Sequence, residues 1–149
     1  MDSVAFRIEL EELAGEGPFP VVAIYVDGNK LQDLARVVEH PFAEAEGNAS
    51  LAGKYAGLSP STVTRGSRHF MGEPDEVEFG DEFGDGETVL LGCVCGEPSC
   101  WPLTAQVEVG GATVTWTDFR TGHRDWDLSG LGPFVFDRHQ YETALVAAK

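Results

Sequence analysis

The chain has 149 residues, with 25 Asp and Glu against 10 Lys and Arg, which gives a net charge of −15 at pH 7. This length is typical of one domain and is sufficient to bury a hydrophobic core without disulfides. The charge repels nucleic acid backbones and anionic membrane surfaces, so the sequence argues against both as partners. There is no apolar run of bilayer-spanning length and no basic region followed by an apolar one at the start, which predicts a cytoplasmic protein.

The N-terminal part predicts two strands followed by a helix. Residues 4–10 alternate between apolar and polar side chains, as in a strand with one face in solvent, and the glycines and prolines of 15–20 are expected to end it. Residues 21–26 form a continuous apolar run rich in β-branched side chains, which predicts a strand covered on both faces at the centre of a sheet. Apolar residues with helical spacing predict a helix over 29–40, capped by Asn29 and limited by Pro41, with a second helical fragment in 42–46.

Two segments without periodicity follow. Residues 47–70 predict a long loop that holds an unusual share of the cationic side chains, either to dock an anion or, in the interpretation we favour, to neutralise the acids that follow. Residues 72–87 form an acidic segment without a basic residue, which predicts a solvated stretch of chain. A concentrated acidic patch of this kind speeds association with a cationic surface.

The clearest local pattern is a β-hairpin. Residues 103–109 and 112–117 alternate apolar and polar side chains on either side of Gly110-Gly111, which fits a two-residue turn. This turn predicts a register in which Val109 faces Ala112 and Val107 faces Val114, with one apolar face and one threonine-rich face.

The three cysteines precede this hairpin in the pattern C-x-C-x4-C. The predicted register brings His123 near them, and Cys93, Cys95, Cys100 and His123 together would form a tetrahedral zinc site. In the competing interpretation, which we favour, the cysteines are small buried hydrophobic residues beside tryptophan. A disulfide and a nucleophilic Cys–His pair are further alternatives, although no local signature of a thiol enzyme surrounds these residues.

A dense set of polar side chains surrounds Trp126 after the hairpin. It forms either a surface loop with internal salt bridges or the rim of a pocket, where Trp126 supplies a flat contact and the arginines hold an anion. The residues of this predicted binding rim are Asp118, Arg120, Arg124, Asp125, Trp126 and Asp127.

The C-terminal part predicts a short strand at 134–136 and a helix over 137–148. Asp137 is a good N-cap with Gln140 at the third helical position, and Phe136 and Tyr141 are spaced as a hydrophobic staple. The order of elements lacks βαβ alternation. The sequence therefore predicts a single α+β domain over 1–149, with a largely antiparallel β-sheet and two main helices, at about 29–40 and 137–148.

Several segments resemble a group of small uncharacterised bacterial proteins, namely GCVCGEPSCWPL, VTWTDFR, HRDW and LGPFVFDRHQYETAL. The first half, with VDGNKLQDLARVVEHPF and LAGKYAGL, is similar to that group too, so the resemblance covers most of the chain. The group has no established activity. The resemblance implies one coherent domain and transfers no catalytic residues.

Common enzyme motifs are missing from the sequence. There is no phosphate-binding glycine loop, H-E-x-x-H helix or G-x-S-x-G elbow. The leading hypothesis is a non-catalytic, acidic cytosolic interaction protein that covers a basic partner protein, with or without a structural zinc. The alternative is a small metal- or thiol-dependent enzyme centred on Cys93, Cys95, Cys100 and His123.

Overall fold

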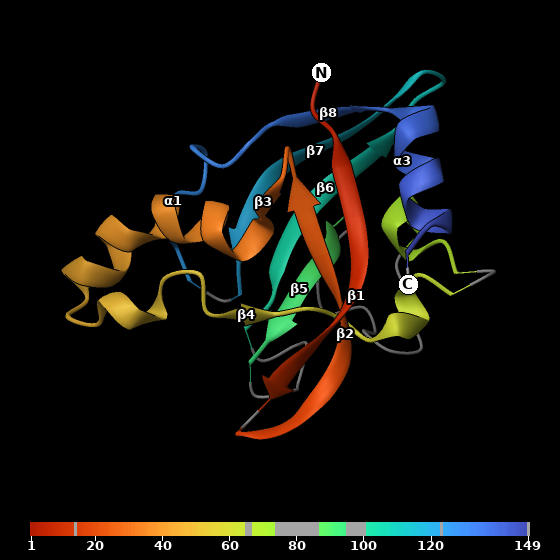
Figure 1. Ribbon diagram of the computed structural model, residues 1–149. Helices are drawn as coiled ribbons and strands as arrows, with labels where there is room; N and C mark the ends of the chain where they lie inside the picture. Colours follow the sequence, from red (N-terminus) through yellow and green to blue (C-terminus); the bar gives the residue numbers. More distant parts are fainter. Residues whose placement is uncertain (14, 65–66, 74–86, 95–100, 123, 149) are drawn as a thin grey trace.

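The strands lie in two antiparallel sheets (Figure 1). The computed structural model describes residues 1–13, 15–64, 67–73, 87–94, 101–122 and 124–148. The three-stranded sheet has the order β1-β2-β3, with β1 (Val4–Leu13), β2 (Glu16–Val26) and β3 (Asn29–Lys30). The five-stranded sheet runs in chain order through β4 (Tyr55–Ala56), β5 (Glu87–Cys93), β6 (Leu103–Val109), β7 (Thr113–Thr121) and β8 (Phe134–Asp137). The helices are α1 (Leu31–Ala45) and α3 (Arg138–Val146), which confirms the predicted α+β class.

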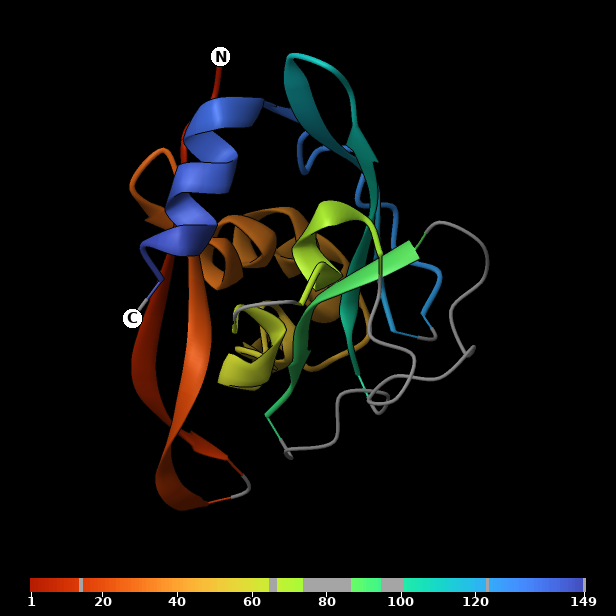
Figure 2. The same cartoon turned by 90° about the vertical axis from the view of Figure 1, so that its right-hand side faces the viewer.

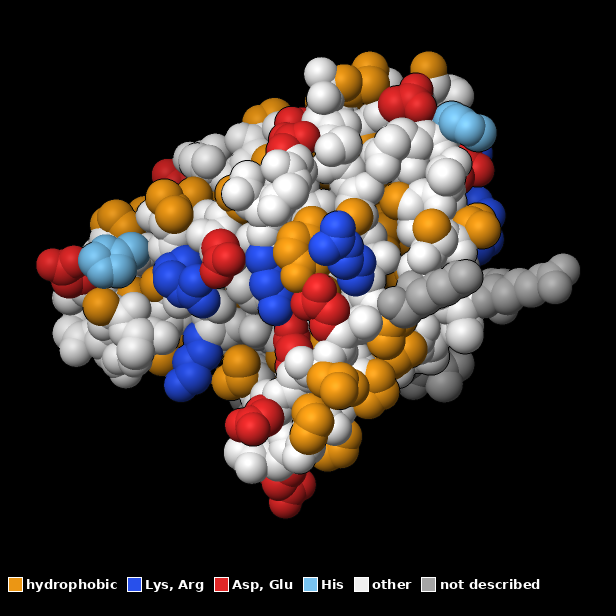
Figure 3. Space-filling model, in the orientation of Figure 1, with side chains coloured by type: hydrophobic (Ala, Val, Ile, Leu, Met, Phe, Trp, Pro, Cys, Tyr) orange, Lys and Arg blue, Asp and Glu red, His pale blue; other side chains and the backbone are white. Residues whose placement is uncertain are grey.

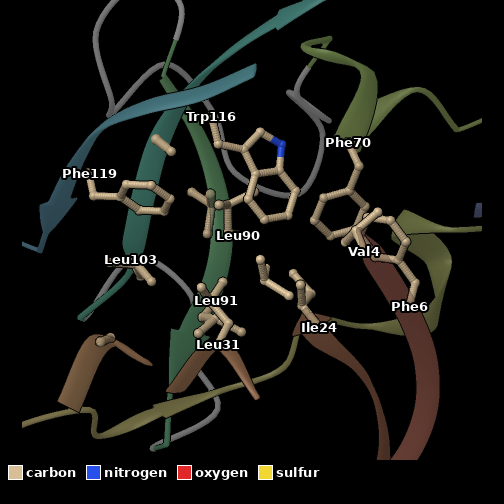
Figure 4. Packing of buried hydrophobic residues seen from close by; sticks show 14 of the residues in the cluster. Val4, Phe6, Ile24, Leu31, Phe70, Leu90, Leu91, Leu103, Trp116 and Phe119 are labelled. Carbon is tan, nitrogen blue, oxygen red and sulfur yellow. The ribbon is translucent and has the colours of Figure 1, made fainter. Parts of the chain in front are cut away.

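The two sheets enclose one hydrophobic core (Figure 2). Side chains from both sheets and from α1 point toward one another there, among them Ile24, Leu31, Leu90 and Trp116 (Figure 4). Backbone hydrogen bonds from Asp2 N to Val135 O and from Val22 N to Leu58 O, both 2.8 Å, join the sheets directly. Burial of apolar surface and these bonds therefore hold the two sheets as one unit.

Strand β2 confirms the covered strand that the sequence predicts. Residues 21–24 and 26 are buried, and β2 lies between β1 and β3 at the centre of the smaller sheet. The expected break over 15–20 is wrong, because β2 already begins at Glu16 and pairs Pro20 with Leu10. The prolines are accommodated because this end of the hairpin is exposed rather than interleaved between other strands.

Helix α1 is longer than predicted. It continues through Pro41 to Ala45 and so includes the expected second fragment. Proline removes one hydrogen bond to the residue four positions earlier, and here that residue is Val37, whose side chain is 76% exposed. The loss therefore falls on the solvent side of the helix, where a carbonyl group is not left buried without a partner. The predicted cap is also wrong, since Lys30 occupies the N-cap position without a side-chain hydrogen bond and Asn29 belongs to β3.

The segment 47–70 is more ordered than a long loop. It contains β4 and three short 3-10 helices, η1 (Ala49–Leu51), η2 (Pro60–Thr62) and η3 (His69–Met71). Tyr55, Leu58 and Phe70 from this segment belong to the core. The ion pair between Arg68 and Glu73 matches the interpretation in which its cations neutralise following acids. Residues 74–86 of the acidic segment lie outside the described residues.

The hairpin forms as predicted but with a different register. Val109 pairs with Val114, Val107 pairs with Trp116, and Gly110 N donates to Thr113 O at 2.8 Å, so the turn is Gly111–Ala112. The predicted register is therefore wrong by one turn residue. Each partner moves by two positions along β7, which leaves the same side chains on the apolar face.

A register shift in β7 changes which side chains of its C-terminal part face the core. The pairing slips between Thr104 and Gln106, and Asp118 on the opposite strand has a φ of 52°. Such an extra residue is a β-bulge, and a positive φ is tolerated by Asp better than by most side chains. Because of the bulge, Phe119 is buried although the alternation set by Trp116 would direct position 119 outward. Asp118 and Arg120 are exposed beside it.

The C-terminal elements confirm the sequence prediction. Asp137 Oδ2 accepts a hydrogen bond from Gln140 N at 2.9 Å, and the rings of Phe136 and Tyr141 pack with centroids 5.5 Å apart. Replacing Asp137 by alanine is expected to lower the free energy of unfolding by about 1 kcal/mol, because the first turn of α3 loses its acceptor. Urea unfolding measures this change. Asp137→Ser should retain most of the stability, and an equal loss in both variants would show that the cap does not act through its side-chain oxygen.

Candidate functional site

A cavity of about 480 Å³ opens between β7 and the segment 126–133. Its floor is apolar, with Phe119, Leu128 and Leu131 almost fully buried. The cavity is also lined by residues of the predicted binding rim, namely Asp118, Arg120, Trp126 and Asp127. The β-bulge creates this arrangement, because it buries Phe119 as the floor and leaves its two neighbours at the mouth.

The two carboxylates of the cavity have no cationic partner among the described residues. Neither Asp118 nor Asp127 forms an ion pair with a described cationic side chain, and both are exposed. The backbone N–H of Ser129 donates to Asp127 Oδ1 at 2.9 Å and is the main cause that lowers the pKa of Asp127. Asp127 therefore stays ionised at neutral pH, and the cavity presents negative charge.

The arginines of the predicted rim have other partners. Arg120 forms an ion pair with Glu87 at 3.1 Å. Arg124 pairs with Glu46, and its guanidinium lies 4.3 Å from the ring centroid of Trp101. Arg124 and Asp125 do not line the cavity. This pairing favours binding of a cation rather than the anion that the sequence hypothesis assigns to the arginines.

Trp126 is fixed at the cavity wall by contacts on several sides. It stacks on Phe42 of α1 with centroids 6.4 Å apart and meets Trp101 edge-on at 5.9 Å. Its Nε1 donates to Glu46. These contacts come from residues distant in sequence, so no local pattern indicates that Glu46 holds both Trp126 and Arg124.

A second polar cluster is buried rather than open. Glu39 of α1 is 0% exposed and accepts a hydrogen bond from Gly53 N at 2.8 Å, while its other oxygen contacts the hydroxyl of Tyr55. The Tyr55 hydroxyl also contacts Thr121 Oγ1. Burial raises the pKa of both Glu39 and Tyr55. The sequence does hold a signal for this cluster, because Glu39 continues the helical spacing of the buried Leu31 and Ala35.

Hydrogen counting assigns the protons in this cluster. The single hydrogen of the Tyr55 hydroxyl cannot be donated to Glu39 and Thr121 at the same time. Tyr55 therefore donates to Glu39 Oε2, and the Thr121 hydroxyl supplies the hydrogen for its own contact with Tyr55 Oη. The arrangement joins α1, β4 and the end of β7, and its burial gives it a structural role.

The predicted zinc site lies mostly outside the described residues. Cys93 ends β5, is half-buried, and pairs across the sheet with Tyr55. Cys95, Cys100 and His123 are not described, so the zinc site stays a prediction. Within the part of the chain that the structure describes, no group of His, Cys, Asp and Glu has the arrangement of a metal site.

The fold and the cavity together define a two-sheet α+β protein with an exposed, acid-lined site. The chain matches no protein-family model, no curated protein and no solved structure. The resemblance to small bacterial proteins therefore stays an expectation from the sequence. Among the described helices, none has the length and apolar character needed to cross a membrane.

Proposed function

We propose that this is a non-catalytic interaction protein of the cytoplasm that binds a basic partner protein, and that the cavity accepts a lysine or arginine side chain of that partner. The observation that carries the proposal is the pair of carboxylates, Asp118 and Asp127, over an apolar floor without a described cationic partner. A net charge of −15 adds a long-range attraction for any cationic surface.

The chemistry of the cavity fits a long cationic side chain. The aliphatic stem of lysine or arginine covers apolar surface, which Phe119, Leu128 and Leu131 provide. Its charged head then forms charge-assisted hydrogen bonds with carboxylates at the mouth. Because these charges are solvent-exposed, we expect binding to weaken as salt screens them.

A titration with a lysine-rich peptide tests this proposal. The double variant Asp118→Asn/Asp127→Asn is expected to bind the peptide on the order of tenfold or more weakly, because two charge-assisted hydrogen bonds become neutral ones. Asparagine keeps the acceptor for Ser129 N and tolerates the positive φ at position 118. Isothermal titration calorimetry at low salt measures the affinity.

The matched control is Asp125→Asn, which removes one exposed charge of the same segment outside the cavity. It is expected to change the affinity by less than the double variant does. An equal loss per removed charge in both variants would show that the peptide responds only to net charge, and would contradict a role for the cavity.

A further inference from the structure

Strand β1 leaves one row of backbone groups open. The bond from Asp27 N to Ser3 O shows that odd-numbered residues direct their N–H and C=O groups toward β2. Even-numbered residues direct theirs outward, where Asp2 N bonds to Val135 O and the side chain of Gln140 bonds to both N and O of Val4. The outward groups of the next even residues, Phe6, Ile8 and Leu10, form no backbone hydrogen bond with any described residue.

An apolar surface accompanies this open edge. The face of β1 that buries Val4 and Phe6 continues to Leu10, which is 67% exposed. Figure 3 shows hydrophobic side chains gathered over the lower part of the β1–β2 hairpin, and in Figure 2 this part extends below α3, away from the rest of the fold. A groove of about 540 Å³ lined by residues 4–7 and the adjacent face of α3 lies at the other end of the edge.

We propose that this edge binds the same edge of a second copy of the chain, as two antiparallel β1 strands related by a two-fold axis through Ile8. The sequence Phe6-Arg7-Ile8-Glu9-Leu10 is self-complementary in this arrangement. Phe6 lies opposite Leu10 of the second copy, Ile8 lies opposite Ile8, and Arg7 lies opposite Glu9. The proposal is independent of the cavity and goes beyond the proposed function.

The direction of the backbone N–H and C=O groups and the charges of Arg7 and Glu9 together select this register. Residues with outward groups must face one another, so the axis passes through a residue rather than between two. An axis through Arg7 places Arg7 opposite Arg7, and an axis through Glu9 places Glu9 opposite Glu9, both of which are repulsive. The axis through Ile8 instead forms two Arg7–Glu9 pairs, at positions outside the hydrogen-bonded pairs, where side chains approach most closely.

The side chains for these pairs are already held in place within one chain. The Tyr25 hydroxyl donates to Glu9 Oε2 at 2.7 Å, and the guanidinium of Arg7 lies 4.8 Å from the Tyr25 ring centroid. The bond between Gln140 and Val4 closes the edge just beyond Phe6, which limits the pairing to Phe6, Ile8 and Leu10 of each copy. Leu10 of the second copy then lies beside the groove at residues 4–7.

The expected dimer is weak and has a distinctive salt dependence. The edge forms about six hydrogen bonds across a small interface, which corresponds to association in the micromolar range. Each copy carries a charge of −15, so the copies repel one another at long range. Salt screens this repulsion and is expected to strengthen self-association, whereas it weakens binding of a cationic partner.

Analytical ultracentrifugation from about 1 to 500 μM, at low and at moderate salt, tests the proposal because the micromolar range is where a small interface associates. We expect a monomer–dimer equilibrium that shifts toward dimer with salt. Arg7→Glu and Glu9→Arg are each expected to weaken the dimer about tenfold, and the double variant is expected to restore it, because the pairs re-form with reversed sign. A monomer at every concentration, or a double variant no better than the single ones, would overturn the proposal.

Two further variants separate the backbone edge from the side chain. Leu10→Pro removes the outward N–H and the exposed side chain, whereas Leu10→Ala removes the side chain alone, and both leave the β1–β2 hydrogen bonds of odd residues intact. We expect Leu10→Pro to weaken the dimer clearly more than Leu10→Ala, with unchanged circular dichroism. Equal dimerisation of these two variants would contradict pairing through the backbone.

Discussion

Replacing Trp116 by alanine is expected to lower the free energy of unfolding by about 3–5 kcal/mol, the usual cost of removing a large buried aromatic side chain. Trp116 is 0% exposed and packs against Phe136 and Tyr141 with ring centroids 4.9 and 5.9 Å apart. Its Nε1 donates to the Tyr141 hydroxyl at 3.2 Å, which donates in turn to Phe70 O at 2.6 Å. One substitution therefore removes packing between β7, β8, α3 and η3.

Denaturant unfolding of Trp116→Ala and Trp116→Phe measures the two parts of this effect. Phenylalanine keeps much of the ring packing and loses the N–H donor, while Tyr141 keeps its bond to Phe70 O. We expect the phenylalanine variant to lose about 1–2 kcal/mol. A loss below about 1 kcal/mol for Trp116→Ala, as for an average surface substitution, would contradict the placement of Trp116 in the core.

Replacing Glu39 by alanine is expected to lower the free energy of unfolding by about 2–4 kcal/mol, because it leaves Gly53 N–H and the Tyr55 hydroxyl without their buried acceptor. Glu39→Gln is expected to cost much less. Its amide oxygen accepts from Gly53 N, and its NH₂ group donates to Tyr55 Oη, which leaves the Tyr55 hydroxyl free to donate to Thr121 Oγ1. Thermal or urea unfolding of the three proteins at pH 4 compares them where Glu39 is protonated.

The pH dependence of these stabilities tests the protonation of Glu39. Burial raises the pKa of Glu39 above its ordinary value of 4.5, so folding favours the protonated form. The stability from this preference is fully present below pH 4.5 and is lost as the pH rises through the raised pKa of the folded state. Relative to Glu39→Gln, the wild-type protein should become less stable from pH 4 to pH 8. A constant difference between the two proteins over this range would contradict a raised pKa for Glu39.

Local patterns in the sequence were sufficient for most of the elements. The apolar run at 21–26, the alternation around the hairpin and the cap at Asp137 each depend on neighbouring residues, and the structure confirms them. Pro41 shows where a local rule fails, because its cost depends on whether the lost hydrogen bond faces solvent. The hairpin register was wrong by one turn residue because Gly110, Gly111 and Ala112 can all occupy a tight turn, and both registers bury the same side chains, so the alternation does not distinguish them.

The candidate site was only partly predictable for a related reason. Composition indicated that charged side chains gather near Trp126, and several of them line the cavity. Which charges remain available depends on partners that fold in from elsewhere, namely Glu46 for Arg124 and Glu87 for Arg120. Because of these pairs, the cavity favours a cation, whereas the sequence led us to expect an anion. Long-range contacts of this kind carry no periodicity that a single sequence can reveal.

The most direct test of the central proposal is capture of a partner from an extract of the protein's own cells at low salt, by wild-type protein and by the Asp118→Asn/Asp127→Asn and Asp125→Asn variants. Our account predicts that the wild-type protein and Asp125→Asn retain a basic protein, which the double variant loses and which moderate salt releases. Capture of no basic protein by the wild-type chain, or equal capture by the double variant, would contradict it.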